Sequence, residues 1–433
     1  MKRLLKGGRV VDPANGRDGI FDVLIDGDRI AEVGASLSAD GAEVMPVAGL
    51  VICPGFIDMH VHLREPGQEH KETVATGTAA AVAGGFTAVA CMPNTRPVND
   101  NAGVTQLILQ KAADANLARV YPIGAVSRGQ KGEELADIAE LKAAGCVAVT
   151  DDGLPVATAI LARRALEYTS MFDMPMIEHC EDPSLKGDGV AHEGPVAASL
   201  GLRGIPGAAE AITAGRDILL AEMTGGHVHI AHMSAWTTIE AVRQGKSRGV
   251  KVTCEVCPHH FTLTDDMLAA PIAYDTNTKM NPPLRAARDR DAMIAGIADG
   301  TVDAIATDHA PHHYDEKNVE FDRAPFGIVG LETAVSITLD RLVHTGVITL
   351  SRMVELMSVN PSRILHVPGG SLAAGAVADI TILAPDLQVT IDKTRLVSKS
   401  KNTPYHGWSF TGGVAATIVG GRTVYSNPAV KLT

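Results

Sequence analysis

The fold of this chain is constrained most by a regular alternation of aliphatic and Ala-rich segments through its middle region. The aliphatic segments resemble buried strands, and Ala-rich segments such as 77–83 and 133–144 are typical of helices. Strand–helix alternation implies parallel pairing. Eight such units close naturally into a (β/α)8, or TIM-like, barrel. The predicted strands are 51–58, 86–91, 120–126, 146–150, 175–178, 228–232, 252–257 and 304–307.

The alternative α/β fold is an open, doubly wound sheet. Such a sheet often carries a G-x-G-x-x-G phosphate loop after an early strand, and none follows an early strand here. The composition suits strands buried between helices, because only 4% of the residues are aromatic and 45% are hydrophobic. We therefore favour the barrel.

The two ends of the chain have a β pattern of their own. Asp26-Gly27 near the start and Gly420-Gly421 near the end are hairpin signals between alternating segments. Neither end has enough strands for a stable sheet alone, and 433 residues exceed a typical single domain. We predict a small composite β domain from 1–50 and 368–433, with the barrel of a metal-dependent hydrolase, 51–367, inserted between them.

Charge and hydropathy exclude several classes of partner and indicate a cellular location. The net charge of −12 argues against nucleic acid and against an anionic membrane surface. No window reaches the roughly 18 apolar residues of a membrane span, and the first residues lack the apolar core of a signal peptide. Several of the six cysteines lie in apolar runs, as reduced, buried thiols do. A cytoplasmic protein acting on a small molecule is expected.

Cys254 and Cys257, followed by His259 and His260, allow a zinc-site interpretation. A single C-x-x-C pair without a second pair is weak support for such a site. We favour the other interpretation, a buried strand over 252–257 with small side chains.

Most of the predicted strands end in polar residues that can bind a metal or a substrate. Barrel active sites are assembled from the C-terminal ends of different strands, so these side chains should converge at one mouth. They are His60 and His62, Asn94, Asp151 and Asp152, Glu178 and His179, His232, and Asp308 and His309.

His60 and His62 are two residues apart, so on a strand both imidazoles leave the same face. Together they can hold a metal ion, and Arg64 just beyond can hold an anion. Two purely structural histidines would leave the other ligand-type strand ends unexplained. The pattern indicates hydrolytic metal chemistry on a negatively charged substrate.

Four histidines and two carboxylates exceed the three protein ligands of a single catalytic zinc. They fit two metals that share a carboxylate and a hydroxide, with hydrolysis, or its reverse, at an amide-like carbon. Of Asp151 and Asp152 only one should enter the site, because adjacent strand residues face opposite ways. His229 should point elsewhere in the barrel.

These motifs resemble those of the dihydroorotases of the amidohydrolase superfamily, in the bacterial class with a bridging Asp instead of a carboxylated Lys. The resemblance runs nearly end to end. Its motifs are DMHVHLREPG (58–67), MPNT (92–95), TDDG (150–153), EHCED (178–182), HMS (232–234), MNPPLR (280–285), TDHAPH (307–312) and PFG (325–327).

The resemblance implies a role for each matching residue. The implied ligands of one Zn²⁺ are His60, His62, Asp152 and Asp308, and those of a second are Asp152, His179 and His232. The implied substrate-binding residues are His62, Arg64, Asn94, Asn281, His312, Phe326 and Gly327. Asp308 would shuttle the proton as a metal-bound hydroxide attacks the ring carbonyl of dihydroorotate; the reverse closes carbamoyl-aspartate into the ring, in pyrimidine biosynthesis. A homodimer, or association with aspartate carbamoyltransferase, is implied by analogy.

Three alternatives remain beside this interpretation. Allantoinases and dihydropyrimidinases share the His-x-His start, but they typically use a carboxylated Lys, whereas the fourth strand here ends in Asp151 and Asp152. A non-catalytic scaffold for another pyrimidine enzyme would be expected to have lost its metal ligands. The segment 309–326 is, in addition, a candidate lid beside the site.

Overall fold

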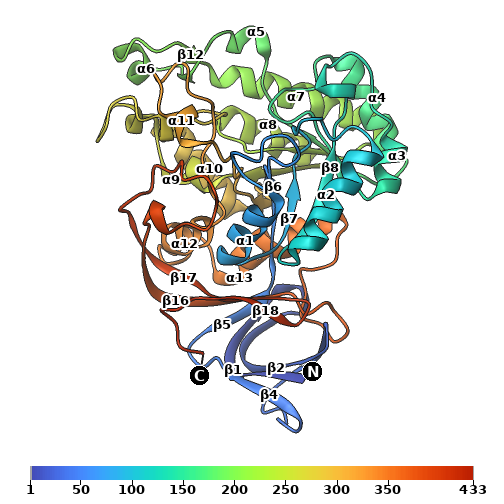
Figure 1. Cartoon of the computed structure of the whole chain (residues 1–433). Helices are drawn as coiled ribbons and strands as arrows, with labels where there is room; N and C mark the ends of the chain where they lie inside the picture. Colours follow the sequence, from blue (N-terminus) through green and yellow to red (C-terminus); the bar gives the residue numbers. More distant parts are fainter. Residues whose placement is uncertain (1, 433) are drawn as a thin grey trace.

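The computed structural model describes residues 2–432 and contains the predicted barrel (Figure 1). Its eight strands are neighbours in chain order, and every pair is parallel. A bridge between Val61 and His309, with His62 N donating to His309 O at 2.9 Å, brings the two edges together. The strands are β6 (Phe56–Val61), β7 (Phe86–Cys91), β8 (Arg119–Gly124), β9 (Ala148–Val149), β10 (Met176–Glu178), β13 (Val228–Ile230), β14 (Val252–Val256) and β15 (Ala304–Ile305).

Helices surround the barrel on its outside (Figure 1). The longer ones are α1 (Val74–Ala83), α2 (Ala102–Ala115), α3 (Ile138–Ala144), α4 (Ala159–Ser170), α7 (Gly207–Thr224), α8 (Trp236–Ser247) and α10 (Ala287–Asp299). Shorter helices are α5 (Pro183–Lys186), α6 (Pro195–Ser199), α9 (Pro258–Thr262) and α11 (Tyr314–Lys317). Several helices begin at side-chain caps, such as Thr73 before α1 and Asn101 before α2.

A second sheet is built from both ends of the chain, as the sequence predicts. Its order is β18-β17-β16-β5-β1-β2-β3, with β4 paired to β1. The hairpins at Gly27 and at Gly420-Gly421 are both present. The strands are β1 (Lys2–Asp12), β2 (Arg17–Asp26), β3 (Arg29–Gly34), β4 (Ala42–Pro46), β5 (Val51–Pro54), β16 (Ile380–Thr390), β17 (Ser409–Val419) and β18 (Arg422–Ser426). The domain limits given above remain a prediction.

The bounds of most predicted elements agree with the structure to within three residues, and two elements differ more. The strand predicted at 51–58 is two strands: β5 pairs with β1 and β16 in the terminal sheet, and β6 starts the barrel. Gly55 lies between them, where a Cβ would meet Thr87 Oγ1 at 2.2 Å, so the chain passes too close for any side chain. The helix predicted at 133–144 begins only at Ile138, because Leu135 bridges to Ser127 and Asp137 caps the helix.

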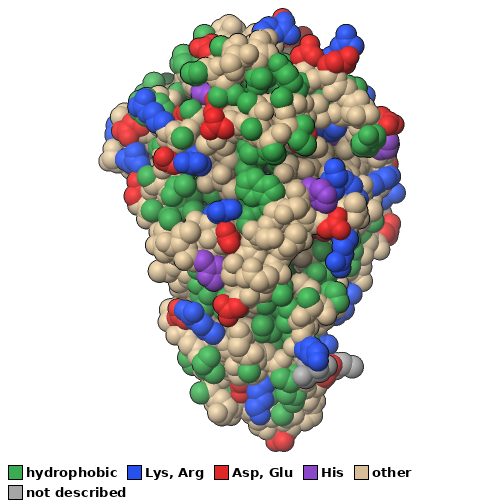
Figure 2. All heavy atoms as spheres, turned by 90° about the vertical axis from the view of Figure 1, so that its left-hand side faces the viewer, with side chains coloured by type: hydrophobic (Ala, Val, Ile, Leu, Met, Phe, Trp, Pro, Cys, Tyr) green, Lys and Arg blue, Asp and Glu red, His purple; other side chains and the backbone are tan. Residues whose placement is uncertain are grey.

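The chain continues after the barrel strands with α12 (Ala334–Thr338), α13 (Leu350–Val354) and α14 (Asn360–Leu365). Side chains of α14 pack in one buried cluster with Ile57, Met59 and several alanines of the barrel strands. Within residues 2–432 no helix is long and apolar enough to cross a membrane. One face of the molecule shows acidic and basic side chains interspersed over a body that narrows toward the terminal sheet (Figure 2).

Candidate active site

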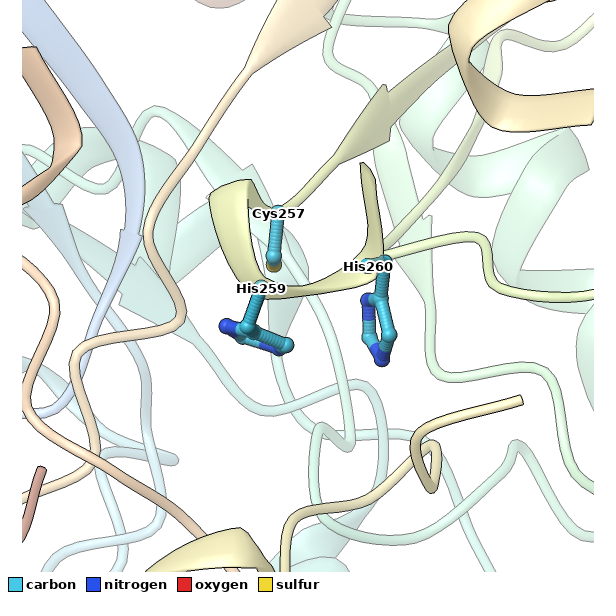
Figure 3. A group of neighbouring side chains, drawn as sticks. All are labelled: Cys257, His259 and His260. Carbon is cyan, nitrogen blue, oxygen red and sulfur yellow. The ribbon is translucent and has the colours of Figure 1, made fainter. Parts of the chain in front are cut away.

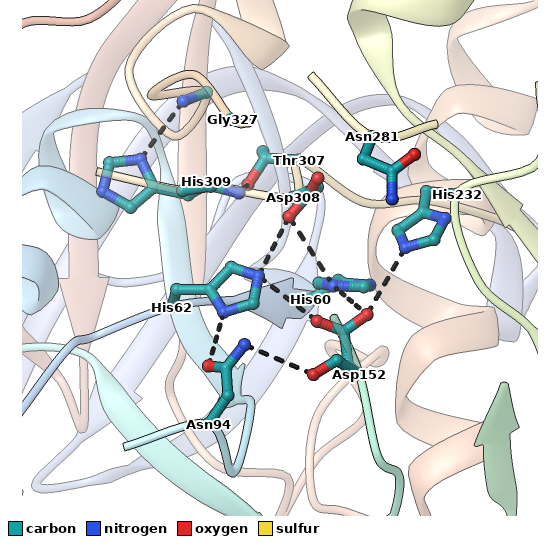
Figure 4. Close-up of polar contacts among 12 residues, drawn as sticks. His60, His62, Asn94, Asp152, His232, Asn281, Thr307, Asp308, His309 and Gly327 are labelled. Atoms are coloured by element: carbon teal, nitrogen blue, oxygen red, sulfur yellow. Dashed lines mark hydrogen bonds and ion pairs between the residues drawn. The ribbon is translucent and has the colours of Figure 1, made fainter. Parts of the chain in front are cut away.

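One carboxylate, that of Asp152, lies among four imidazoles at the barrel mouth, and Figure 4 labels three of them, those of His60, His62 and His232. Its Oδ1 is 3.3 Å from His60 Nε2, and its Oδ2 is 3.5 Å from His62 Nε2. The same Oδ1 is 3.5 Å from His179 Nδ1 and 3.4 Å from His232 Nε2. The carboxyl ends of β6, β9, β10 and β13 therefore meet at a single side chain.

Asp308, which follows β15, also contacts His60 and His62. Its Oδ1 lies 3.1 Å from His62 Nε2 and 3.6 Å from His60 Nε2. Both Asp308 and Asp152 are buried. Burial alone would raise the pKa of Asp308, but the hydrogen bond from His62 and the charge of His60 outweigh it and lower that pKa to about 2.

Asp151 faces away from this cluster. Its carboxylate accepts hydrogen bonds from the backbone N–H of Ser127 at 3.0 Å and from the Ser127 hydroxyl at 2.5 Å. The structure thus brings Asp152, and not Asp151, to the histidines.

The spacing of these atoms suits metal ions. His179 Nδ1 and His232 Nε2 are 3.0 Å apart, and they lie 3.5 and 3.4 Å from Asp152 Oδ1. Two ligand atoms of a tetrahedral zinc site are roughly 3.3 Å apart, so these distances are close to those of a shared zinc ion. His60 Nε2 is buried and has no hydrogen-bond partner in the described part of the chain. The groups His60–His62–Asp308 and His60–Asp152–His232 each place three ligand atoms within 4.8 Å of one another. The site fits metal ions in donor type and spacing.

Glu255 on β14 contacts this histidine cluster, and the sequence analysis did not single it out. Its Oε1 lies 2.7 Å from His60 Nδ1, and its Oε2 lies 3.2 Å from His229 Nε2. Burial opposes the charge of Glu255, but His60 and His229 hold its pKa well below the usual value. An outer carboxylate of this kind fixes the orientation of a ligating imidazole. The sequence did contain an indication of this contact, because a Glu within a buried apolar strand needs a hydrogen-bonding or charged partner.

His229, which the sequence predicts to point elsewhere, lies on the far side of Glu255. Its Nδ1 is 2.8 Å from Thr253 Oγ1. It belongs to a buried polar chain behind the histidine cluster.

A cavity of about 200 Å³ opens over the cluster and is lined by every residue predicted to bind substrate. These residues are His62, Arg64, Asn94, Asn281, His312, Phe326 and Gly327. Asn94 Oδ1 lies 2.9 Å from His62 Nδ1, and Asn281 Nδ2 lies 3.2 Å from His179 Nε2. The cavity thus places polar side chains directly above the histidines.

Arg64 is the buried cation of this cavity. Its Nε donates to Pro311 O at 3.1 Å, and its Nη2 lies 3.4 Å from His312 Nε2. Burial lowers the pKa of Arg64 to about 10, so it stays charged near neutral pH. Burial and the charge of Arg64 hold the pKa of His312 well below its usual value, so His312 is neutral.

Lys186 and Glu181 were also not predicted. Lys186 lines the cavity at the end of α5, and its Nζ donates to Glu181 Oε2 at 2.6 Å. Neither residue follows a strand directly, so strand-end reasoning could not find them.

Cys257, His259 and His260 cluster at the start of α9 (Figure 3). Their ligand atoms lie within 4.8 Å of one another, but this group contains only three of them. Burial and the nearby carboxylates of Asp308 and Glu255 raise the pKa of the Cys257 thiol well above its usual value, which disfavours the thiolate that zinc requires. The predicted strand is present as β14, and all six cysteines are free and buried.

The comparisons with known proteins agree with this geometry. A family model described as dihydro-orotase-like matches residues 49–238. A protein named dihydroorotase from Syntrophotalea carbinolica is 53% identical over 98% of this chain and 99% of its own length. Another from Pelotomaculum thermopropionicum is 54% identical over 100% of both chains.

Solved structures show the same fold. L-hydantoinase (dihydropyrimidinase) from Arthrobacter aurescens superposes with a TM-score of 0.88 at 23% identity, covering 98% of this chain and 96% of that one. Dihydropyrimidinase from Brevibacillus agri gives 0.83 at 22% identity, covering 99% and 95%.

Proposed function

This chain belongs to the dihydroorotase family of cyclic amidohydrolases, and on that basis we propose how its barrel mouth interconverts N-carbamoyl-L-aspartate and L-dihydroorotate. The reaction is a step of pyrimidine biosynthesis. The observation that carries the proposal is the single carboxylate of Asp152 within 3.5 Å of four imidazoles, beneath a cavity that holds one buried cation.

We propose two Zn²⁺ ions per chain. His60, His62, Asp152 and Asp308 would hold one, and Asp152, His179 and His232 would hold the other. The ions would supply a nucleophile at neutral pH, by lowering the pKa of a water, and would polarise the carbonyl that is attacked. Glu255 would keep the His60 ring oriented toward the site.

The substrate would be anchored by its carboxylate. Arg64 is a buried, charged guanidinium whose planar fork matches two carboxylate oxygens. Asn94 and Asn281 would offer amide groups to the polar edge of the ring, and Phe326 and Gly327 also line the cavity. This arrangement orients the ring carbonyl over the histidine cluster.

Asp308 would move the proton. It stands 3.1 Å from His62 Nε2 at the floor of the cavity, as an ionised carboxylate that can accept a proton. In ring opening it would accept the proton of the attacking water and then donate it to the leaving ring nitrogen. In ring closure the same transfers run backwards.

Dihydropyrimidinase activity is the rival function within this fold. Its substrates lack the carboxylate of dihydroorotate, so the buried charge of Arg64 would be left without a partner, which is costly. The likeness to hydantoinases at 21–24% identity extends to the fold alone.

The proposal is tested by assaying the purified, metal-loaded chain with dihydroorotate, carbamoyl-aspartate, dihydrouracil and hydantoin. We expect turnover of the first two and little of the others. Preferred turnover of an uncharged ring would refute the proposed role of Arg64. Two further expectations remain predictions: a cytoplasmic location, which the six free cysteines support, and a homodimer or an aspartate carbamoyltransferase partner.

A further inference from the structure

Two buried lysines, Lys279 and Lys317, lie behind the cavity wall. They are 3% and 5% exposed. The lysine ion pairs within residues 2–432 all involve other lysines. A buried ammonium group without a carboxylate is costly unless its N–H groups are satisfied in another way. In both lysines the ammonium N–H groups donate to backbone carbonyls.

Lys279 binds the start of the segment that carries Phe326. Its Nζ donates to Phe321 O at 2.8 Å and to Asp322 O at 3.0 Å. The same Nζ lies 4.7 Å from the centre of the Phe326 ring, within cation–π range.

Lys317, at the end of α11, binds the other end of that segment. Its Nζ donates to Pro325 O at 2.8 Å, Gly327 O at 3.0 Å and Lys279 O at 3.3 Å. An ammonium group has three N–H donors, and here each has a carbonyl acceptor. The full set is satisfied only while Lys317 is charged.

The two lysines connect substrate-facing parts of the chain that are far apart in sequence. Gly327 N donates to Lys279 O at 2.9 Å, so the segment 321–327 is hydrogen-bonded to the backbone two residues before Asn281. Asn281, Phe326 and Gly327 line the cavity, whereas neither lysine does. The lysines therefore act on the shape of the cavity and not on the substrate directly.

We propose that Lys279 and Lys317 are positioning residues that hold Asn281, Phe326 and Gly327 in the arrangement that binds substrate. The inference rests on the proposed binding roles of those three residues. It predicts that loss of the lysines weakens binding of both dihydroorotate and carbamoyl-aspartate while the proton transfer by Asp308 is kept.

Lys317 changes its protonation state near neutral pH. Burial and the charge of Lys279 lower the pKa of Lys317 to about 7, against the opposing effect of Asp275. Burial likewise lowers the pKa of Lys279 to about 8, with Asp322 opposing and Lys186 adding to the shift. The charge of Lys317 also contributes to the lowered pKa of His312, which is neutral.

The sign of the pH effect follows from the donor count. A neutral amine keeps two N–H groups and turns a lone pair toward the third carbonyl, so the protonated form fastens the segment better. Substrate affinity should therefore fall as pH rises through the pKa of Lys317.

The test is Lys317→Met in the full-length, metal-loaded enzyme, with KM and kcat measured for both substrates. Near pH 6 we expect KM to rise about tenfold, kcat to stay within about threefold, and metal content to stay unchanged. The KM ratio of variant to wild type should fall toward about pH 9, because the wild type loses its charge there. Ionisations shared by both proteins cancel in that ratio.

Two further variants complete the design. Lys246→Met removes an amine on the outer helix α8 that donates to Thr301 O at 2.7 Å. This variant should leave KM unchanged. Lys317→Gln keeps two N–H donors without charge, and its KM should be raised and lack the wild-type pH dependence above neutrality; it also serves if the Met variant does not fold. A pH-independent KM ratio, an unchanged KM, or a loss of kcat and metal in parallel would overturn the proposal. A wild type that does not turn over dihydroorotate would instead refute the proposed function.

Discussion

Asp152 Oδ1 lies 3.3 Å from His60 Nε2, although the two residues are 92 positions apart and follow different strands of the barrel. The contact exists because β6 and β9 are parallel strands of one barrel, whose carboxyl ends open at the same mouth. It makes Asp152 the point where the ligand-type residues of four strands meet.

Asp308→Asn is expected to remove most of the turnover. The amide preserves the size of the side chain but cannot accept the proton, so kcat should fall by roughly 10²- to 10⁴-fold. Binding of dihydroorotate, measured by calorimetry, should change much less. Near-wild-type kcat would rule out the proton-shuttle role.

Arg64→Met is expected to weaken binding of carboxylate-bearing substrates. Losing a charge-assisted hydrogen bond of about 2 kcal/mol raises KM roughly thirtyfold. The KM for dihydrouracil, which has no carboxylate, should not rise. Equal effects on both substrates would show that Arg64 shapes the cavity and does not hold the anion.

Glu255→Gln is expected to lower metal affinity by about 10- to 100-fold, because the carboxylate that orients His60 is lost. Competition against a chromophoric chelator measures this affinity. Glu316→Gln, which changes a carboxylate that pairs with Lys71 outside the histidine cluster, is the matched control and should leave the affinity unchanged.

Asp379→Ala is expected to destabilise the junction between the barrel and the terminal sheet. Its buried carboxylate binds Arg119 through two hydrogen bonds of 2.6 and 3.1 Å and accepts the N–H of Gly420 at 2.8 Å. The loss should cost about 2–3 kcal/mol in urea unfolding.

The matched control for that variant is Asp18→Ala, which removes an exposed pair with Arg9. It should cost less than about 1 kcal/mol. Similar losses for the two variants would show that the junction contributes no more than a surface ion pair.

Much of the fold could be predicted because barrel strands buried on both faces are continuous aliphatic runs. The break at Gly55 was missed, although Pro54-Gly55 is a turn signal inside the apolar run from Val51 to Ile57. The start of α3 was placed too early because the helical pattern of 133–137 gives way to the bridge between Leu135 and Ser127.

The candidate site was predictable where ligands follow strands directly. Pattern alone left Asp151 and Asp152 equivalent; the family resemblance indicated Asp152, and only the fold places Asp151 on Ser127. Glu255 lies within its strand, and Lys279 and Lys317 act through backbone carbonyls, which leave no trace in the sequence. Contacts of that kind depend on the folded chain.

The central claim, a two-metal site joined by Asp152, is tested most directly by metal analysis of the wild type alongside the Asp152→Asn and Asp151→Asn variants, each assayed for dihydroorotate turnover. We predict about two metal ions per wild-type chain, loss of metal and turnover in Asp152→Asn, and retention of both in Asp151→Asn. An Asp152→Asn chain that keeps two metals and wild-type turnover, or a metal-free wild type that is fully active, would contradict the account.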